Sequence, residues 1–142
     1  MNIVTKKVTL PVRIEWGSKE FAAQLKADNF LFTTQADSIP AILVKLKNLL
    51  ADYLEHEGKQ ATPWKDLLVD DFDFQCEYNL AAFFELYPEL KISAIAARAG
   101  INPNLLQQYV SGNKRASQAQ ANKIQTAIHD LANELRQISV SH

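Results

Sequence analysis

The sequence predicts an α+β protein in which a small antiparallel sheet with one helix is followed by an all-helical helix-turn-helix domain. Two patterns predict this class. Apolar and polar residues alternate in several segments before residue 78, as in half-buried strands, and one long segment there has the three- and four-residue spacing of an amphipathic helix. Only helical patterns follow. We therefore expect two domains, residues 1–78 (α+β) and residues 79–142 (all-α).

Three strands are expected first, as an antiparallel meander. Val8 to Trp16 alternate, and so do Phe21 to Leu25 after the turn signal Gly17-Ser18. A second turn at Asp28-Asn29 leads to a third strand, Phe30 to Gln35. Pro11 has no N–H to donate, so the first strand is expected either at a sheet edge or with an open side at this residue.

One helix and a fourth strand complete the first domain. Ser38 is an expected N-cap with Pro40 in the first turn, and the helix should end near Gly58. A loop is expected over 59–71, and Phe72 to Tyr78 alternate as a strand. The helix should pack one stripe on the meander: Ile42, Leu43, Leu46, Leu49, Leu50, Tyr53 and Leu54.

The second domain is bounded by two further helices. Asn79 should cap a helix from Leu80 to Tyr87, which Pro88 ends. Ser117 and Gln120 have the spacing of a capping box for the last helix. The apolar stripe of that helix is Ile124, Ala127 or Ile128, Leu131, Leu135 and Ile138.

Between them, Ile92 to Gly112 has the pattern of a helix-turn-helix. Ala94 to Ala99 form an alanine-rich helix, and Gly100 permits the sharp turn after it. Asn102-Pro103 is typical of an N-cap and first helical position, opening a second helix that ends at Gly112. Ala96 and Ala99 are the small residues expected where the two helices cross. The expected apolar anchors are Ile95, Ile101, Leu106 and Tyr109.

The outer face of that second helix is rich in amides, which can pair with adenine in the DNA major groove. Positive charge in the loop that follows could hold phosphate. The candidate DNA-binding residues are Asn102, Asn104, Gln107, Gln108, Ser111, Asn113, Lys114 and Arg115. The alternative is an ordinary helical hairpin with a polar surface.

Charge favours the DNA hypothesis. Residues 91–142 carry six Lys and Arg against two acids, a net of +4, whereas residues 1–90 carry nine against fourteen, a net of −5. Lys91 to His129 contains no acidic residue, so nothing there repels phosphate. This asymmetry indicates a nucleic-acid-binding end on an otherwise acidic chain.

Composition is that of a soluble globular protein, with 47% apolar and 22% charged residues. No apolar run approaches the roughly 18 residues of a membrane span, and the N-terminus lacks the apolar core of a signal peptide. The single cysteine, Cys76, cannot form an internal disulfide and is expected to be a buried thiol. We expect a cytoplasmic protein without membrane contact.

No pattern predicts catalysis, a cofactor or a metal site. His56, His129 and His142 are far apart, one cysteine cannot supply zinc thiolate pairs, and the four glycines do not cluster into a phosphate loop. Four aspartates lie close together in the sequence: Asp66, Asp70, Asp71 and Asp73. Such a group is more typical of a solvated loop than of a Mg²⁺-binding site.

The chain resembles the HicB antitoxin family, most closely its short HicB-like regulators of the Bacteroidetes type. The resemblance rests on FDFQCEYNLAAFFELYPEL (Phe72–Leu90), ISAIAARAGINPNLLQQYVSGNKRAS (Ile92–Ser117) and KIQTAIHDLANELRQISV (Lys123–Val140), and less specifically on EFAAQL (Glu20–Leu25) and TTQADSIPAILVKLKNLL (Thr33–Leu50). It implies a partly formed RNase H-like fold, DNA binding through Pro103–Ser111, autoregulation, and dimers or larger assemblies.

Two functions follow as hypotheses. The first is a sequence-specific DNA-binding regulator that acts as a two-fold dimer, through either the last helix or the sheet edge, on half-sites about 34 Å apart. The second is an antitoxin-type interaction module. Its acidic N-terminal domain would sequester a small RNA-cleaving toxin or another partner, since opposite charge steers association.

Overall fold

The computed structural model describes residues 8–27, 30–57, 64 and 66–142, and confirms the α+β class. The chain divides into two compact units, Met1–Ala82 and Phe83–His142. The division falls inside a helix, α2 (Leu80–Leu86), whereas the sequence analysis places it just before that helix.

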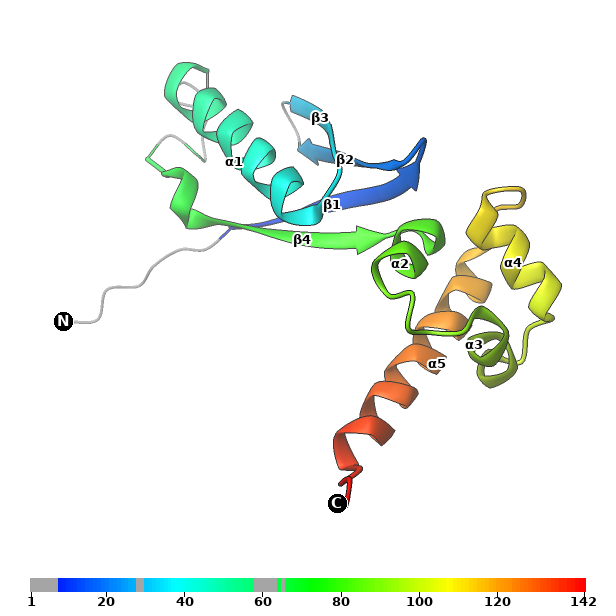
Figure 1. Ribbon diagram of the computed structural model, residues 1–142. Helices are drawn as coiled ribbons and strands as arrows, with labels where there is room; N and C mark the ends of the chain where they lie inside the picture. Colours follow the sequence, from blue (N-terminus) through cyan, green and yellow to red (C-terminus); the bar gives the residue numbers. More distant parts are fainter. Residues whose placement is uncertain (1–7, 28–29, 58–63, 65) are drawn as a thin grey trace. The chain divides into compact units, whose positions relative to one another are not determined.

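The first unit is built on a four-stranded sheet (Figure 1) of β1 (Val8–Gly17), β2 (Glu20–Ala27), β3 (Phe30–Ala36) and β4 (Phe72–Tyr78), in the order β3-β2-β1-β4. The three-stranded antiparallel meander is confirmed. However, β4 pairs parallel to β1, so the sheet is mixed and not wholly antiparallel as expected. The helix between β3 and β4 returns the chain to the end of the sheet where β3 began, so β4 runs in the direction of β3 and β1.

Pro11 lies in the second strand from the edge, because β1 pairs with β2 on one side and β4 on the other. The expectation of an edge strand is therefore wrong. The alternative, an open side at this residue, agrees with the register: pairing with β2 begins at Val12, opposite Leu25, one residue after the proline. A residue without an N–H can sit there without removing a ladder bond.

The hairpin between β1 and β2 turns at Ser18 and Lys19, which both have positive φ, 53° and 64°. Positive φ at both central residues is the geometry of a type I′ turn, whose twist matches that of paired strands. The turn therefore lies one residue later than the turn that the sequence predicts at Gly17-Ser18. The second expected turn, Asp28-Asn29, lies outside the described residues.

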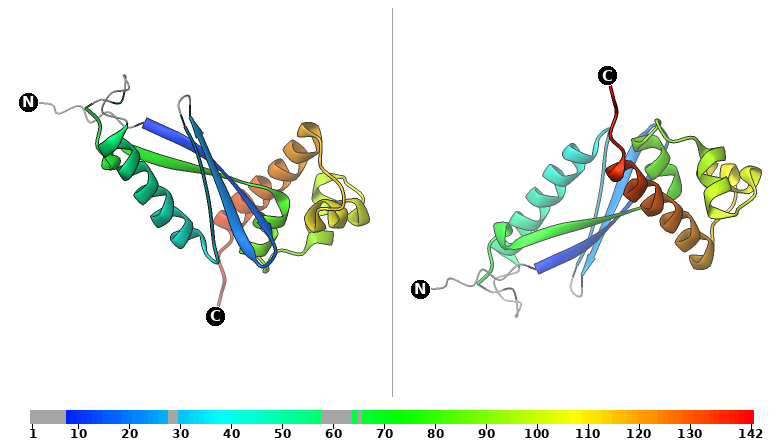
Figure 2. Two further views of the ribbon diagram at one scale, coloured as in Figure 1. Left: turned by 90° about the horizontal axis from the view of Figure 1, so that it is seen from above. Right: turned by 90° about the horizontal axis from the view of Figure 1, so that it is seen from below.

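Helix α1 (Ile39–His56) lies along one face of the sheet, as Figures 1 and 2 show, and contacts β2 and β3. Ser38 accepts a hydrogen bond from the Ala41 N–H at 3.3 Å, which confirms the predicted cap. The core between helix and sheet contains Leu10, Val12, Ile14, Phe21, Ala23, Leu25, Ile42, Leu46, Leu50, Tyr53 and Leu54. Alternating positions of the strands thus face the helix, as the period-two pattern predicts.

The sequence predicts a loop over 59–71, of which 59–63 and 65 lie outside the described residues. Its last residues form a short 3-10 helix, η1 (Val69–Asp71). Trp64 packs edge-on against the rings of Phe30 and Phe72, with centroids 5.4 and 5.0 Å away, and so extends the aromatic part of the core.

The second unit is helical, with α3 (Ile92–Ala99), α4 (Pro103–Ser111) and α5 (Gln118–Gln137) after α2. Helix α3 contacts both α4 and α5. Ser117 accepts a hydrogen bond from the Gln120 N–H at 3.2 Å, but the predicted capping box does not close: Gln120 Oε1 is buried and has no hydrogen-bond partner among the described residues. No helix within the described ranges is long and apolar enough to cross a membrane.

Candidate nucleic-acid interface

The turn between α3 and α4 is fixed by Gly100, whose φ of 72° lies in the left-handed region. The Ile101 N–H donates to the Ala96 carbonyl at 2.9 Å, which closes the end of α3. Ile101 is then buried, together with Ile95 on α3 and Leu106 on α4. These burials confirm three of the expected anchors, while Tyr109 is only half-buried.

Asn102 begins α4 as its N-cap. Its Oδ1 accepts a hydrogen bond from the Asn104 N–H at 2.8 Å, and Pro103 occupies the first helical position. The oxygen that caps the helix is also one of the two atoms needed for bidentate pairing with adenine. Asn102 is therefore committed to positioning α4 in this conformation, and only its NH₂ group is free to donate.

The outward face of α4 consists of Asn104, Gln107, Gln108 and Ser111, which share one side because they are three and four positions apart. All are exposed except Gln108, which is half-buried. The side-chain amides of Asn104 and Gln107 have no hydrogen-bond partner in the described part of the protein. This face can therefore offer paired donor and acceptor groups to an outside molecule.

A positively charged loop follows α4. Gly112 ends the helix with a φ of 84°, and the Lys114 N–H returns to the Gln108 carbonyl at 3.2 Å. Asn113, Lys114 and Arg115 are all exposed, and neither cation has an acidic partner among the residues described. The loop thus places two unpaired charges directly beside the amide face.

One cation of this unit is not free. Arg98, at the end of α3, forms an ion pair with Glu134 on α5. Arg98 is one of the six cations in residues 91–142, and no local sequence pattern shows that it is paired, because its partner lies 36 residues away. Of the other five cations in residues 91–142, Lys114 and Arg115 are the two that directly follow α4.

The acidic residues near η1 have structural partners. Asp71 accepts a hydrogen bond from the Leu68 N–H at 2.9 Å, and Asp70 pairs with Lys47 at 3.3 Å. His56 lies 3.4 Å from Asp52 on the exposed side of α1. Across the described segments, no three His, Cys, Asp or Glu side chains are grouped closely enough to hold a metal ion.

Cys76 is half-buried on β4. Burial raises the pKa of its thiol, and a side-chain hydrogen bond with Tyr78 opposes part of that shift. A thiol with a raised pKa is a weak nucleophile at neutral pH. The side chain lies beside Val12 of β1, on the core side of the sheet, but it is only half-buried, so the full burial expected from the sequence is not observed.

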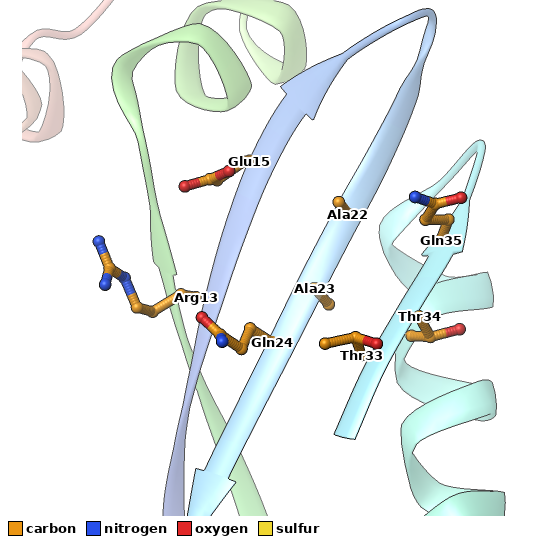
Figure 3. A pocket seen from close by; sticks show the side chains of 8 residues that line it. All are labelled: Arg13, Glu15, Ala22, Ala23, Gln24, Thr33, Thr34 and Gln35. Atoms are coloured by element: carbon orange, nitrogen blue, oxygen red, sulfur yellow. The ribbon is translucent and has the colours of Figure 1, made fainter. Parts of the chain in front are cut away.

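The uncovered face of the sheet has a shallow hollow of about 510 Å³, shown in Figure 3. Two cross-strand rows form most of its floor and walls: Arg13, Gln24 and Thr33 in one, and Glu15, Ala22 and Gln35 in the other. Charges of both signs, amides and a hydroxyl make this a surface for polar contacts.

Comparison of the chain with models of known protein families, with curated proteins and with solved structures found no match in any of the three.

Proposed function

We propose that this chain is a sequence-specific DNA-binding transcriptional regulator, similar to HicB antitoxins, that works in the cytoplasm and controls its own operon. The observation that carries the proposal is the outward face of α4, where the amides of Asn104 and Gln107 are exposed and have no hydrogen-bond partner among the described residues. Amides of this kind recognise adenine by two hydrogen bonds at once.

The surroundings of that face support the proposal. Lys114 and Arg115, which pair with no acid in the part of the chain that the structure describes, supply positive charge at the end of α4, where phosphate contacts would fix the register of the helix on DNA. The absence of acids from Lys91 to His129 keeps repulsion low. A nine-residue helix reads few bases, so we expect two copies to bind half-sites about one DNA turn apart.

The test is an unbiased selection of bound duplexes from random oligonucleotides with the full chain. Gel-shift titration then compares the DNA upstream of the gene with a scrambled duplex of equal length. We expect an enriched motif with two-fold symmetry and binding to the selected site at least about 10³-fold tighter than to the scrambled duplex. Equal affinity for both duplexes overturns the proposal.

A second candidate is an antitoxin-type module in which the first unit holds a small basic RNA-cleaving protein or another partner. The uncovered polar sheet face with its hollow favours it, as does the net of −5 in residues 1–90. Co-expression with any small basic protein encoded next to this gene tests it. The candidate is supported if the two proteins co-purify and if Gln24→Lys and Gln35→Lys abolish the co-purification. It is rejected if the two proteins purify separately.

A further inference from the structure

The distal half of α5 carries apolar side chains that the described residues leave exposed. In the first half of the helix Ile124 and Ala127 are buried, and α5 contacts α3. Further along, Leu135 is 57% exposed, and Ile138, which caps the helix, is 61% exposed. Single exposed apolar residues are ordinary, whereas several along one helix face mark an interaction surface.

The order of residues in this stripe is symmetrical. Ile128, Leu131, Leu135 and Ile138 are separated by three, four and three positions, so the stripe has the same residue types and spacing in both directions. The same spacing defines the a and d positions of a coiled coil, with Ile128 and Leu135 at a and Leu131 and Ile138 at d. The four residues therefore share one side of α5, where Leu135 and Ile138 are exposed, Ile128 and Leu131 are half-buried, and Ile138 is the C-cap with an extended backbone.

A second copy of this stripe, turned end to end, complements the first. Antiparallel helices place an a residue opposite a d residue of the partner helix. Ile128 then meets Ile138 of the other copy, and Leu131 meets Leu135, so all four layers pair like with like. A contact in which the same surface faces itself across a two-fold axis is the usual form of a homodimer.

We propose that α5 pairs antiparallel with α5 of a second copy of this chain, through Ile128, Leu131, Leu135 and Ile138, about a two-fold axis level with Asn133. The pairing goes beyond the proposed function, since it is argued from α5 alone and stands whether or not the chain binds DNA.

The charges beside the stripe are compatible with this contact. Glu134 flanks it on one side, where antiparallel pairing brings it close to its own counterpart, and its ion pair with Arg98 offsets that repulsion. The other flank carries Ala132 and Ser139, which are uncharged and small. Close approach of the two helices therefore meets no unpaired like charges.

The expected dimer is weak. A contact of about three helical turns buries less than the roughly 1,200 Å² that marks the lower limit of standard interfaces. We therefore expect a dissociation constant in the micromolar range, on the order of 10 µM.

Sedimentation of the full chain without DNA, from about 1 to about 200 µM, tests the pairing. We expect a shift from monomer to dimer across this range for the wild type, and monomer throughout for Leu135→Glu. Val44→Glu is the matched control, because Val44 is a similarly exposed apolar residue, 59%, on α1. The proposal is overturned if the wild type stays monomeric, since its stripe is then covered by its own chain. It is also overturned if the Leu135→Glu protein still dimerises.

Disulfide trapping tests the orientation and does not depend on how Leu135→Glu folds. Leu131→Cys and Leu135→Cys proteins of different tag mass, both also carrying Cys76→Ser, are mixed and oxidised gently. Antiparallel pairing predicts that the mixed 131–135 disulfide forms in excess over the two same-site disulfides. An excess of 131–131 and 135–135 disulfides indicates parallel helices and overturns the proposal. Failure to select a DNA motif does not alter either result.

Discussion

The side-chain oxygen of Asn102 accepts a hydrogen bond from the backbone N–H of Asn104 at 2.8 Å, at the point where α4 begins. One amide therefore fixes the start of the helix, and the next, two residues on, faces outward from it. The two asparagines have different tasks although the sequence presents them as one polar group. Stability measurements should separate these tasks from DNA recognition.

Removal of the cap should cost stability. We expect Asn102→Ala to lower the free energy of unfolding by about 1 kcal/mol, because an N–H of the first turn loses its partner. Asn102→Asp should keep that stability, since its carboxylate also accepts the bond, yet weaken DNA binding through added negative charge. Urea unfolding and gel-shift titration measure the two effects. Asn104→Ala is the control for stability, and an equal loss of stability in both alanine variants would contradict the assignment.

Base and phosphate contacts should separate in binding experiments. We expect Asn104→Ala and Gln107→Ala each to reduce the preference for the selected site over scrambled DNA about tenfold, since a bidentate pair contributes about 1–3 kcal/mol of discrimination. Lys114→Ala should instead weaken binding to every duplex and reduce the salt slope by about one.

The controls for that series have the same side chains elsewhere on the surface. Asn133→Ala on α5 and Lys26→Ala on β2 remove an exposed amide and an exposed cation away from α4. Their titrations should match the wild type. If Lys26→Ala weakens binding as much as Lys114→Ala does, net charge and not the position of the loop controls affinity.

Replacement of Gly100 by a residue with a side chain should destabilise the protein because of the backbone φ angle alone. A Cβ added there meets no atom within 4 Å, but φ is +72°. Gly100→Ala should therefore destabilise the protein by about 1–2 kcal/mol. Gly17→Ala provides the comparison, because its Cβ also meets nothing and its φ lies outside the left-handed region. Thermal unfolding that gives the same loss for both would exclude backbone strain as the cause.

In the β1–β2 turn, the opposite substitution, of a residue by glycine, should increase the stability of the protein. Lys19 has a φ of 64° in a type I′ turn, where glycine is preferred. Strain relief of about 1–2 kcal/mol exceeds the entropic cost of glycine, about 0.5–1 kcal/mol, so Lys19→Gly should stabilise the protein by about 0.5 kcal/mol. Urea unfolding measures the change, with Lys19→Ala as the control that removes the charge but keeps the strain.

The Cys76 thiol should react slowly at neutral pH, because burial raises its pKa and the thiolate is the reactive form. Tyr78→Phe removes the hydrogen bond that lowers the pKa, so the reaction should slow further. Rates with a disulfide reagent across the neutral and alkaline range, with the urea-unfolded chain as reference, measure both effects. A faster reaction in Tyr78→Phe would contradict this account.

The same shift bears on stability. A folded-state pKa above that of the unfolded chain favours the protonated thiol, so the contribution of Cys76 is complete below the unfolded-state pKa and is lost as the pH rises above it. The effect therefore belongs to the alkaline side of neutrality, where titration of the unfolding free energy in wild type and Cys76→Ser would reveal it.

Local signals predict the elements of this chain well. Ser38, Asn102 and Ser117 each cap the helix that the sequence analysis assigns to them. Cap and turn residues act within three or four positions, so their effect is visible in the sequence.

Features that depend on distant partners were not predictable in the same way. The direction of β4 follows from how α1 returns the chain, and the place of Pro11 beside two strands follows from that pairing. At the candidate site, the spacing of polar residues identifies the exposed face of α4. It does not show that the side-chain oxygen of Asn102 accepts the capping hydrogen bond, or that Arg98 is paired with Glu134. Both depend on side-chain geometry that periodicity does not contain.

The pairing of β1 with β4 also sets an order of assembly. Val8 meets Phe72, so one side of β1 gains its neighbour only after the meander and α1 have been synthesised. Contacts between distant parts of a chain form slowly, whereas helical hairpins form fast. During translation β1 therefore has an open edge until β4 leaves the ribosome, and this interval is when the nascent chain is most exposed to aggregation and most in need of a chaperone.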